Sequence, residues 1–473
     1  MTDTNEPEDQ ASSIDRAYRP HMSGWNDPYE VLSKCQEELK TQKRLKAPLE
    51  WASIQRRRAT ALLWIGKDGD KPDYLEEAIA VFRQSLEVWQ FDQHPHEWAR
   101  VQNQIGMAHN RLGESQNGDR HLEEAIAAHR AALTVWTRER FPQCWSDTHA
   151  WIGNALHKLG TRQANTALLE EAIRSVRAAL DLYTHRGPAN VIEHWDLVGN
   201  LTTLGETYRE LGCIKGHIPH LRQAAKAFLD ALPRLRADPV DYCRTMNELG
   251  ETYLLIGARE AGTHHLKRAR LAQTVAVSRL DWAKGDMPYL WARIHLRFGK
   301  VCMALGAREE NTARYREAIE HFEEARDVLD YAASQGPGLF GSDEQNALRF
   351  QIDAVCHLSK AQLTLGVGQK DITVAKAAAQ TLHAALTDDL RKALPEGWAE
   401  IQEALGDTLL TIGAIMEGAE GVACVRRGLV AFKEGLQALA GRRGEAASQT
   451  LIGSLKAKSE KGVALLETLR HTA

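Results

Sequence analysis

Asparagine and arginine recur along one stripe of a repeated segment in this 473-residue chain, and both side chains suit the binding of a peptide. An asparagine amide can donate one hydrogen bond to a peptide C=O and accept another from an N–H, whatever the peptide sequence. Arginine adds a fork of donors for carboxylates. The stripe therefore predicts a peptide-binding site, although the same polar residues could also do no more than solvate a helix face. The candidate residues are Arg56, Arg100, Asn103, Asn110, Asn154, His157, Glu206, Arg209, Arg244, Asn247, Glu251 and Lys300.

Metal and catalytic chemistry find little support in the sequence. Histidines pair in HPH (94–96), HIPH (217–220) and HHL (264–266), but no acidic or cysteine ligands follow at a supporting spacing. No phosphate-binding loop, no GxSxG and no HExxH is present. We therefore expect no metal, no cofactor and a non-catalytic protein. An enzyme that uses His157, Glu206 and Arg209 in a groove is retained as an alternative.

Charge and composition restrict the class of partner. The formal net charge is −4 and the pI is near 6.6, so no general field draws the chain to nucleic acid or to an anionic membrane. No apolar run approaches the ~20 residues of a membrane-spanning helix, and residues 1–20 lack the apolar region of a signal peptide. The seven cysteines include no CxxC pair. We expect a cytoplasmic protein with a protein or peptide partner.

A repeat positions the candidate residues. YLEEAIAVFRQSLEVW (74–89) returns as HLEEAIAAHRAALTVW (121–136) and LLEEAIRSVRAALDLY (168–183), with apolar residues at helical spacing. Each copy is preceded by another helical segment, which is the first helix of the unit, such as WARVQNQIGMAHNRLG (98–113). We expect the glycine at the end of this segment to end the helix in the left-handed conformation. Each unit is thus predicted to be a helical hairpin. Eight units follow from the aligned glycines Gly66, Gly113, Gly160, Gly212, Gly257, Gly306, Gly366 and Gly413.

A small residue recurs eight positions after the aromatic residue that opens most first helices. Because glycine costs about 1 kcal/mol inside a helix, a close approach of the partner helix is expected there. A single hairpin cannot bury its apolar stripe, so neighbouring hairpins must stack and share one core. Positions 2, 5, 9 and 12 of the first helix then form a separate stripe, which holds the candidate residues. The small residues are Ala59, Gly106, Gly153, Gly205, Gly250, Gly299, Ser359 and Gly406.

These strings resemble tetratricopeptide repeats. LGETY at 204–208 and 249–253 is similar to the first-helix pattern of that family, and AIAVF (78–82) and AIEHF (318–322) are similar to its second-helix pattern. The family's unit has 34 residues, whereas this unit has about 47, and we expect the extra length in the hairpin turn and the inter-repeat loop. HEAT and armadillo stacks are rivals on length. The resemblance, to a long-turn bacterial variety, implies an all-α, right-handed α-solenoid of about eight hairpins, with the stripe lining its concave groove.

The predicted organisation has four parts. Residues 1–26 form a disordered acidic tail, 27–46 an N-terminal capping helix with Asp27 as N-cap, 47–440 the solenoid, and 441–473 a C-terminal capping helix. The segment 333–345 is expected to be a surface insertion. We expect an adaptor or scaffold that binds a peptide or helical segment of a partner. The alternative is a sensor that binds a signalling peptide or small molecule and controls a separate enzyme. The oligomeric state is left open.

Overall fold

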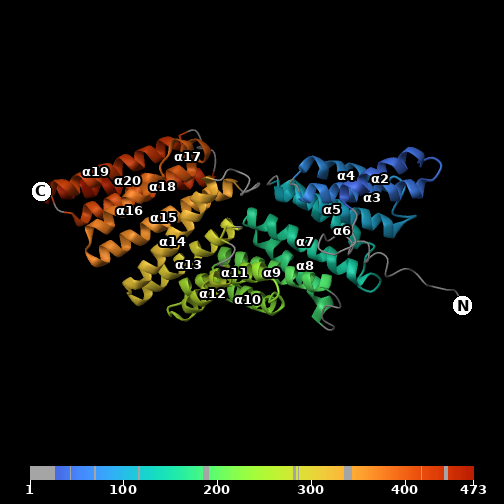
Figure 1. Ribbon diagram of the computed structural model, residues 1–473, viewed down its shortest axis with the longest axis horizontal. Coiled ribbons are helices and arrows are strands. Elements are labelled where there is room, and N and C mark those ends of the chain that lie inside the picture. The colour runs from blue at the N-terminus through green and yellow to red at the C-terminus, as the bar shows by residue number, and fades with distance from the viewer. Residues whose placement is uncertain are drawn as a thin grey trace. The chain divides into compact units, whose positions relative to one another are not determined.

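The architecture is entirely helical in the part of the chain that the structure describes. No strand occurs among the described residues, and helices follow one another in consecutive pairs (Figure 1). This confirms the predicted all-α class and the hairpin unit. The expected tail 1–26 and most of the expected insertion 333–345 lie outside the described residues. The computed structural model describes residues 27–42, 44–68, 71–115, 118–184, 191–280, 284–285, 287–334, 344–416, 418–440 and 446–472.

The chain divides into two compact units, residues 1–237 and 238–473, within the segment expected to be one continuous stack. In unit 1, helix α2 packs on α3, and the first helices of successive hairpins pack on each other and on the preceding second helices. The Asp27 side chain accepts the N–H of Tyr29 at 3.0 Å and so caps α2 as expected. Unit 1 contains α2 (Pro28–Thr41), α3 (Pro48–Asp68), α4 (Pro72–Leu86), α5 (Pro95–Ser115), α6 (Asp119–Leu133), α7 (Pro142–Arg162), α8 (Thr166–Thr184), α9 (Val191–Lys215), α10 (Ile218–Ala231) and η1 (Leu232–Arg234).

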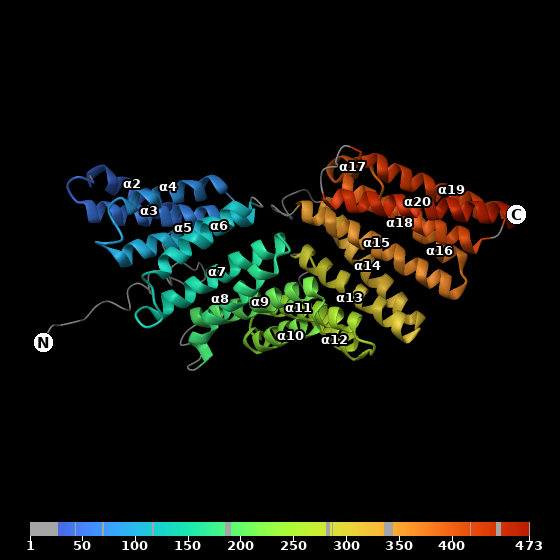
Figure 2. The ribbon, with the colours of Figure 1, turned by 180° about the vertical axis from the view of Figure 1, so that it is seen from behind.

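Unit 2 repeats the same scheme with four more hairpins and a final helix. Figure 2 shows its first helices α11, α13, α15 and α18 following one another, and each packs on the next. The last helix, α20, packs on both α18 and α19, as a terminal cap does. Unit 2 contains α11 (Pro239–Arg259), α12 (His264–Leu280), α13 (Pro288–Glu309), α14 (Thr312–Ser334), α15 (Glu344–Gln369), α16 (Ile372–Ala385), α17 (Asp388–Ala393), α18 (Pro395–Ile415), α19 (Gly418–Ala438) and α20 (Ala446–Thr472).

The small residue at position eight is a contact point, as the sequence predicts. A Cβ on Gly106 would lie 2.6 Å from His129 Cε1, and a Cβ on Gly299 would lie 2.5 Å from Phe322 Cε1. In both hairpins the facing side chain comes 23 residues later, from the second helix. The glycine therefore makes room for a large buried side chain of its own hairpin.

The glycine near the end of each first helix does not end it, so that prediction is wrong. Gly160 lies within α7, and the left-handed residue is Ala164, four positions later, with φ 48°. The N–H of Asn165 donates to Gly160 O at 2.8 Å, which closes the helix in a Schellman arrangement. Glycine is present because a Cβ would lie 3.0 Å from Leu169 of α8. The left-handed position is taken by Gly216, Glu310 and Lys370 in three other hairpins.

The extra length of the unit does not lie in the hairpin turn, which corrects a second expectation. Two residues, 310 and 311, separate α13 from α14, and four at most separate the two helices of any hairpin. Instead the first helices are long, from 21 residues in α5 to 26 in α15.

Within the described residues, no helix combines the length and apolar character needed to cross a lipid bilayer.

Candidate functional site

Asn103 and Asn110 of α5 lie inside their hairpin, where they are 5% and 1% exposed. Both contact the ring of His129 of α6: His129 Nδ1 lies 2.7 Å from Asn103 Oδ1, and Asn110 Nδ2 lies 3.3 Å from His129 Nε2. Since an amide oxygen accepts and an amide nitrogen donates, His129 carries its proton on Nδ1. Burial lowers the pKa of His129 to about 3, with a smaller contribution from His109, so the ring is neutral. These two asparagines are therefore engaged within the fold.

Arg56 and Arg100 are also enclosed, at 6% and 7% exposed. The Arg100 guanidinium lies 3.4 Å from Glu97 Oε2, one turn earlier on α5, and 3.1 Å from His96 Nε2. The structure thus places the first four candidate residues, which the sequence assigns to a ligand-facing stripe, in the interior of unit 1. Helix periodicity identified their stripe, but it does not show that His129 of α6 contacts Asn103 and Asn110.

The packed helices α7 and α9 carry four candidate residues that are all partly exposed. Asn154 and His157 come from α7, one turn apart, while Glu206 and Arg209 come from α9. His157 Nε2 lies 3.9 Å from Glu206 Oε2. Burial, followed by the charges of Arg209 and Lys158, lowers the pKa of His157 to about 4. We call Asn154, His157, Glu206 and Arg209 the α7–α9 surface.

Two acceptors of the α7–α9 surface, on His157 and Asn154, receive no hydrogen bond from the described residues. Thr207 Oγ1 donates to Thr203 O at 2.7 Å, so it accepts from His157 Nδ1, which lies 3.2 Å away. The neutral ring of His157 is left with a lone pair on Nε2. Asn154 Oδ1 is buried and accepts no hydrogen bond from the described residues. Asn110 Oδ1 and Asn247 Oδ1, inside their hairpins, are in the same state, so this oxygen alone does not indicate a ligand.

In unit 2, the candidate residues mostly contact neighbouring helices. Lys300 Nζ of α13 lies 3.5 Å from Asp353 Oδ2 of α15. Glu251 Oε2 of α11 lies 2.5 Å from an Arg297 nitrogen of α13. Asn247 is fully buried in the α11–α12 hairpin, whereas Arg244 is exposed.

Ion pairs link successive first helices of unit 2. Arg297 of α13 also reaches Glu248 of α11 at 2.7 Å, and Arg349 of α15 reaches Glu400 of α18 at 2.8 Å. Lys458 of α20 lies 2.6 Å from Asp407 of α18. Charged residues in and beside the stripe therefore hold the first helices of unit 2 together, a role that the sequence did not reveal.

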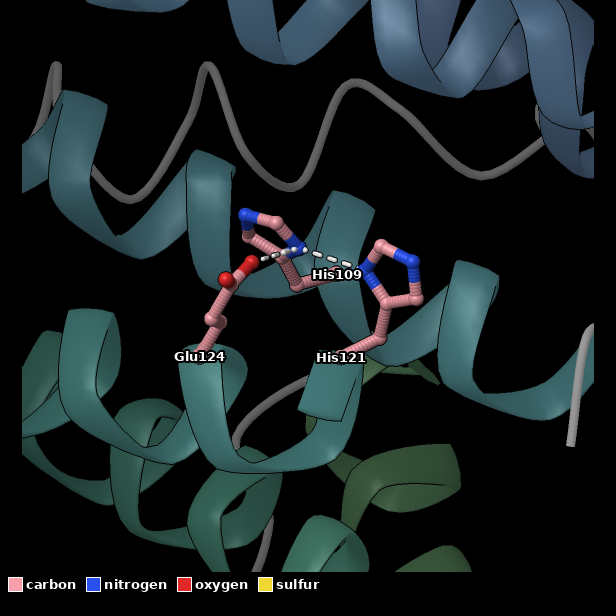
Figure 3. Close-up of side chains that lie close together, drawn as sticks. All are labelled: His109, His121 and Glu124. Atoms are coloured by element: carbon pink, nitrogen blue, oxygen red, sulfur yellow. Dashed lines mark hydrogen bonds and ion pairs between the residues drawn. The ribbon is translucent and has the colours of Figure 1, made fainter. Parts of the chain in front are cut away.

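A cleft of about 380 Å³ between α4, α5 and α6 was missed at the sequence level. Arg83 of α4, Gln102 and His109 of α5, and Glu124 of α6 contribute to its lining. His109 and Glu124 also converge with His121, as Figure 3 shows. The spacing of twelve and then three residues crosses a hairpin turn, so no linear metal motif signals it.

A second group that could hold a metal, Cys302, Glu317 and His321, lies in the α13–α14 hairpin. Its carboxylate is already bonded, since Arg270 and Arg314 reach Glu317 at 2.7 and 2.8 Å. Burial, and then the nearby Glu317, raise the pKa of the Cys302 thiol well above its usual value, which disfavours the thiolate that would bind a metal. Of the two groups in the described residues, the one in unit 1 is better suited to a cation.

Comparison with known proteins adds a likeness of fold. No family model matches the sequence, and no curated protein does. Among solved structures, the C-terminal part of a TPR repeat-containing protein from Cytophaga hutchinsonii has 14% identity and a TM-score of 0.43, covering 73% of this chain and 99% of that one. In fold, the chain is similar to tetratricopeptide-repeat proteins.

Two further solved structures are similar at the same low level. A signal transduction ATPase with a tetratricopeptide repeat sensor, from Pyrococcus horikoshii, has 14% identity and a TM-score of 0.41, over 96% of this chain and 56% of that one. A Rap protein complexed with competence and sporulation factor has 12% identity and a TM-score of 0.38, over 88% of this chain and all of that one. The binding of that factor is a property of the Rap protein.

Proposed function

We propose that this chain is a non-catalytic interaction protein that binds an extended or helical segment of a partner protein at the α7–α9 surface of unit 1. The observation that carries the proposal is His157 Nε2, whose lone pair is left on the partly exposed α7–α9 surface because Nδ1 donates to Thr207. A backbone N–H of a bound segment would satisfy it. The partly buried Asn154 lies one turn before His157 on α7.

Charge at the α7–α9 surface suits a peptide. Arg209 adds a fixed positive charge and N–H groups that can donate to a carboxylate of the partner, and Glu206 adds a negative charge. We propose that the other eight candidate residues support the fold and do not contact the partner. Those in unit 1 are buried, and those in unit 2, except Arg244, are buried or paired with neighbouring helices.

The properties of His157 favour binding over catalysis. A general base works best when its pKa lies near the operating pH, and the pKa of His157 is lowered to about 4. Its nearest described carboxylate oxygen, on Glu206, lies 3.9 Å away, beyond hydrogen-bond distance. The pair therefore lacks the tight base–carboxylate contact on which nucleophilic and acid–base sites depend.

The test is a selection from a displayed library of random peptides on the full chain, followed by affinity measurement of the enriched peptides. Three proteins are compared: the wild type, the double variant Asn154→Ala/Arg209→Ala, and the control Arg130→Ala. Arg130 lies on α6, a second helix, and its side chain is 56% exposed. We expect the double variant to bind at least about tenfold more weakly, which corresponds to about 1.4 kcal/mol, and the control to bind like the wild type.

Circular dichroism and thermal unfolding establish that all three proteins fold equally. Two results contradict the proposal. One is a selection that enriches no peptide, and the other is equal affinity of the wild type and the double variant for every enriched peptide.

A further inference from the structure

Three potential metal ligands converge across the α5–α6 hairpin of unit 1. His109 Nδ1, on α5, lies 3.1 Å from His121 Nδ1 and 3.2 Å from Glu124 Oε2, both on α6. Figure 3 shows the two imidazoles and the carboxylate pointing toward one another from the two helices. All three ligand atoms lie within 4.8 Å of one another. We call these three residues the hairpin triad.

Two of the three distances suit a small tetrahedral cation, and the third, between His121 and Glu124, is within 4.8 Å. Zinc binds imidazole nitrogen at about 2.0–2.1 Å and carboxylate oxygen at about 2.0–2.2 Å, so two ligands of a tetrahedral site are about 3.3 Å apart. The two short edges of the hairpin triad, at 3.1 and 3.2 Å, are close to that value. Two nitrogens and one oxygen form a donor set that zinc favours, whereas magnesium and calcium prefer oxygen alone.

The protonation of the hairpin triad is compatible with a metal. Neutral imidazole is the form that binds metals, with one ring nitrogen carrying the proton and the other a lone pair. Without a metal, a proton on His109 Nδ1 can bridge to His121 and Glu124. With the proton on Nε2 instead, the Nδ1 lone pair faces the other two ligands.

The surroundings support the ligands and leave room for a fourth. Arg120 Nε donates to Glu124 Oε1 at 2.9 Å, which holds the carboxylate so that Oε2 faces His109. Such an outer contact is common at metal sites. His109 and Glu124 also line the cleft between α4, α5 and α6, so a water molecule or a small ligand could complete the coordination from that side.

The repeat provides an internal comparison. In the α9–α10 hairpin the three equivalent positions hold Tyr208, His220 and Gln223, and in the α11–α12 hairpin they hold Tyr253, His265 and Arg268. These copies keep the histidine of the second helix but replace the other ligands. In both copies the histidine ring lies against the tyrosine ring of the first helix. A histidine at this position is thus a packing residue elsewhere, whereas the α5–α6 hairpin adds the two ligands that these copies lack.

We propose that His109, His121 and Glu124 form a binding site for one zinc ion, which joins the end of α5 to the start of α6 and keeps one coordination position toward the cleft. The site is separate from the α7–α9 surface and does not depend on the function proposed for it.

Zinc binding is measured by titration calorimetry on the full chain without an affinity tag, after removal of metals with a chelator. The variants are His121→Ala and Glu124→Gln, whose side chains are only partly buried. The matched control is His220→Ala, at the position equivalent to His121. We expect one zinc ion per chain for the wild type and for His220→Ala, and affinity at least about tenfold weaker for the two triad variants. Magnesium should not bind.

Thermal unfolding with and without zinc gives a second readout. Because zinc would bind the folded state, it should raise the unfolding temperature of the wild type and of His220→Ala, but not of His121→Ala. The proposal is overturned if the wild type binds zinc no more tightly than His121→Ala does. It is also overturned if His220→Ala abolishes binding while His121→Ala retains it, since the zinc would then lie elsewhere.

Discussion

Gly205 of α9 lies directly against the ring of Phe228 of α10, so that a Cβ at position 205 would stand 2.7 Å from both Cε1 and Cζ. The ring is fully buried and cannot move away without disturbing the core of the α9–α10 hairpin. The glycine thus serves contact between the two helices, at a cost in helix propensity. Gly199, on the same helix, is exposed and has no atom within 4 Å of an added Cβ.

These two glycines make opposite predictions for the same substitution. Gly199→Ala should raise the free energy of unfolding by up to about 1 kcal/mol, because alanine favours the helix and meets nothing. Gly205→Ala gains the same propensity but forces a methyl group into the Phe228 ring, and overpacking costs about 1–3 kcal/mol, so we expect a net loss. Urea denaturation of the full chain measures both. Stabilisation of Gly205→Ala to the level of Gly199→Ala would show that the ring is not in contact.

The polar network of His129 should be replaceable as a whole but not in part. His129→Phe alone leaves Asn103 and Asn110 without their ring partners and should cost about 1–3 kcal/mol. The α13–α14 hairpin holds Leu296, Met303 and Phe322 at the equivalent positions, and these residues pack in one apolar cluster. The triple variant Asn103→Leu/Asn110→Met/His129→Phe should therefore recover most of the loss in thermal unfolding. A triple variant less stable than His129→Phe would contradict this view.

The buried His129 also predicts a pH dependence. Its pKa is 6.5 in the reference state and about 3 in the folded chain, so between these values the unfolded chain binds a proton that the folded chain does not. Stability therefore falls as the pH decreases from about 6.5 toward 3, by at most about 1.4 kcal/mol per pH unit from this residue. The triple variant lacks this contribution. Its free energy of unfolding should fall less between about pH 6.5 and 4, and equal slopes for the two proteins would refute the assignment.

The hairpin repeat was predictable because packing imposes it at every copy. The apolar spacing of YLEEAIAVFRQSLEVW and the small residue at position eight both report contacts inside one hairpin, and both were found. The residues at which the first helices end were harder to predict from the sequence. Gly160 has a packing role that a sequence alone does not distinguish from a left-handed end, and the true left-handed residue, Ala164, is of a type that rarely adopts it.

The candidate site was only partly predictable, because the partner of each stripe residue comes from another helix. Asn110 and His157 hold the same position in successive first helices. The second helix supplies His129 to Asn110, whereas the equivalent residue of the next hairpin is Val176, whose apolar side chain faces Gly153. Val176 can offer His157 no hydrogen bond, and His157 contacts Thr207 of α9 instead. Periodicity along the first helices cannot distinguish these two environments.

The ion pairs of unit 2 predict one costly substitution and one neutral one. Arg297 and Glu248 have side chains 16% and 8% exposed, with 2.7 Å between their charged atoms, and Arg293 lies further from Glu248 at 3.7 Å. Arg297→Ala leaves the Glu248 carboxylate buried with a poorer partner and should lower the free energy of unfolding by about 3 kcal/mol. The control Arg244→Ala removes an exposed pair with Asp241 and should change little. Urea denaturation compares them, and an equal effect of both substitutions would show that the pair between α11 and α13 does not stabilise unit 2.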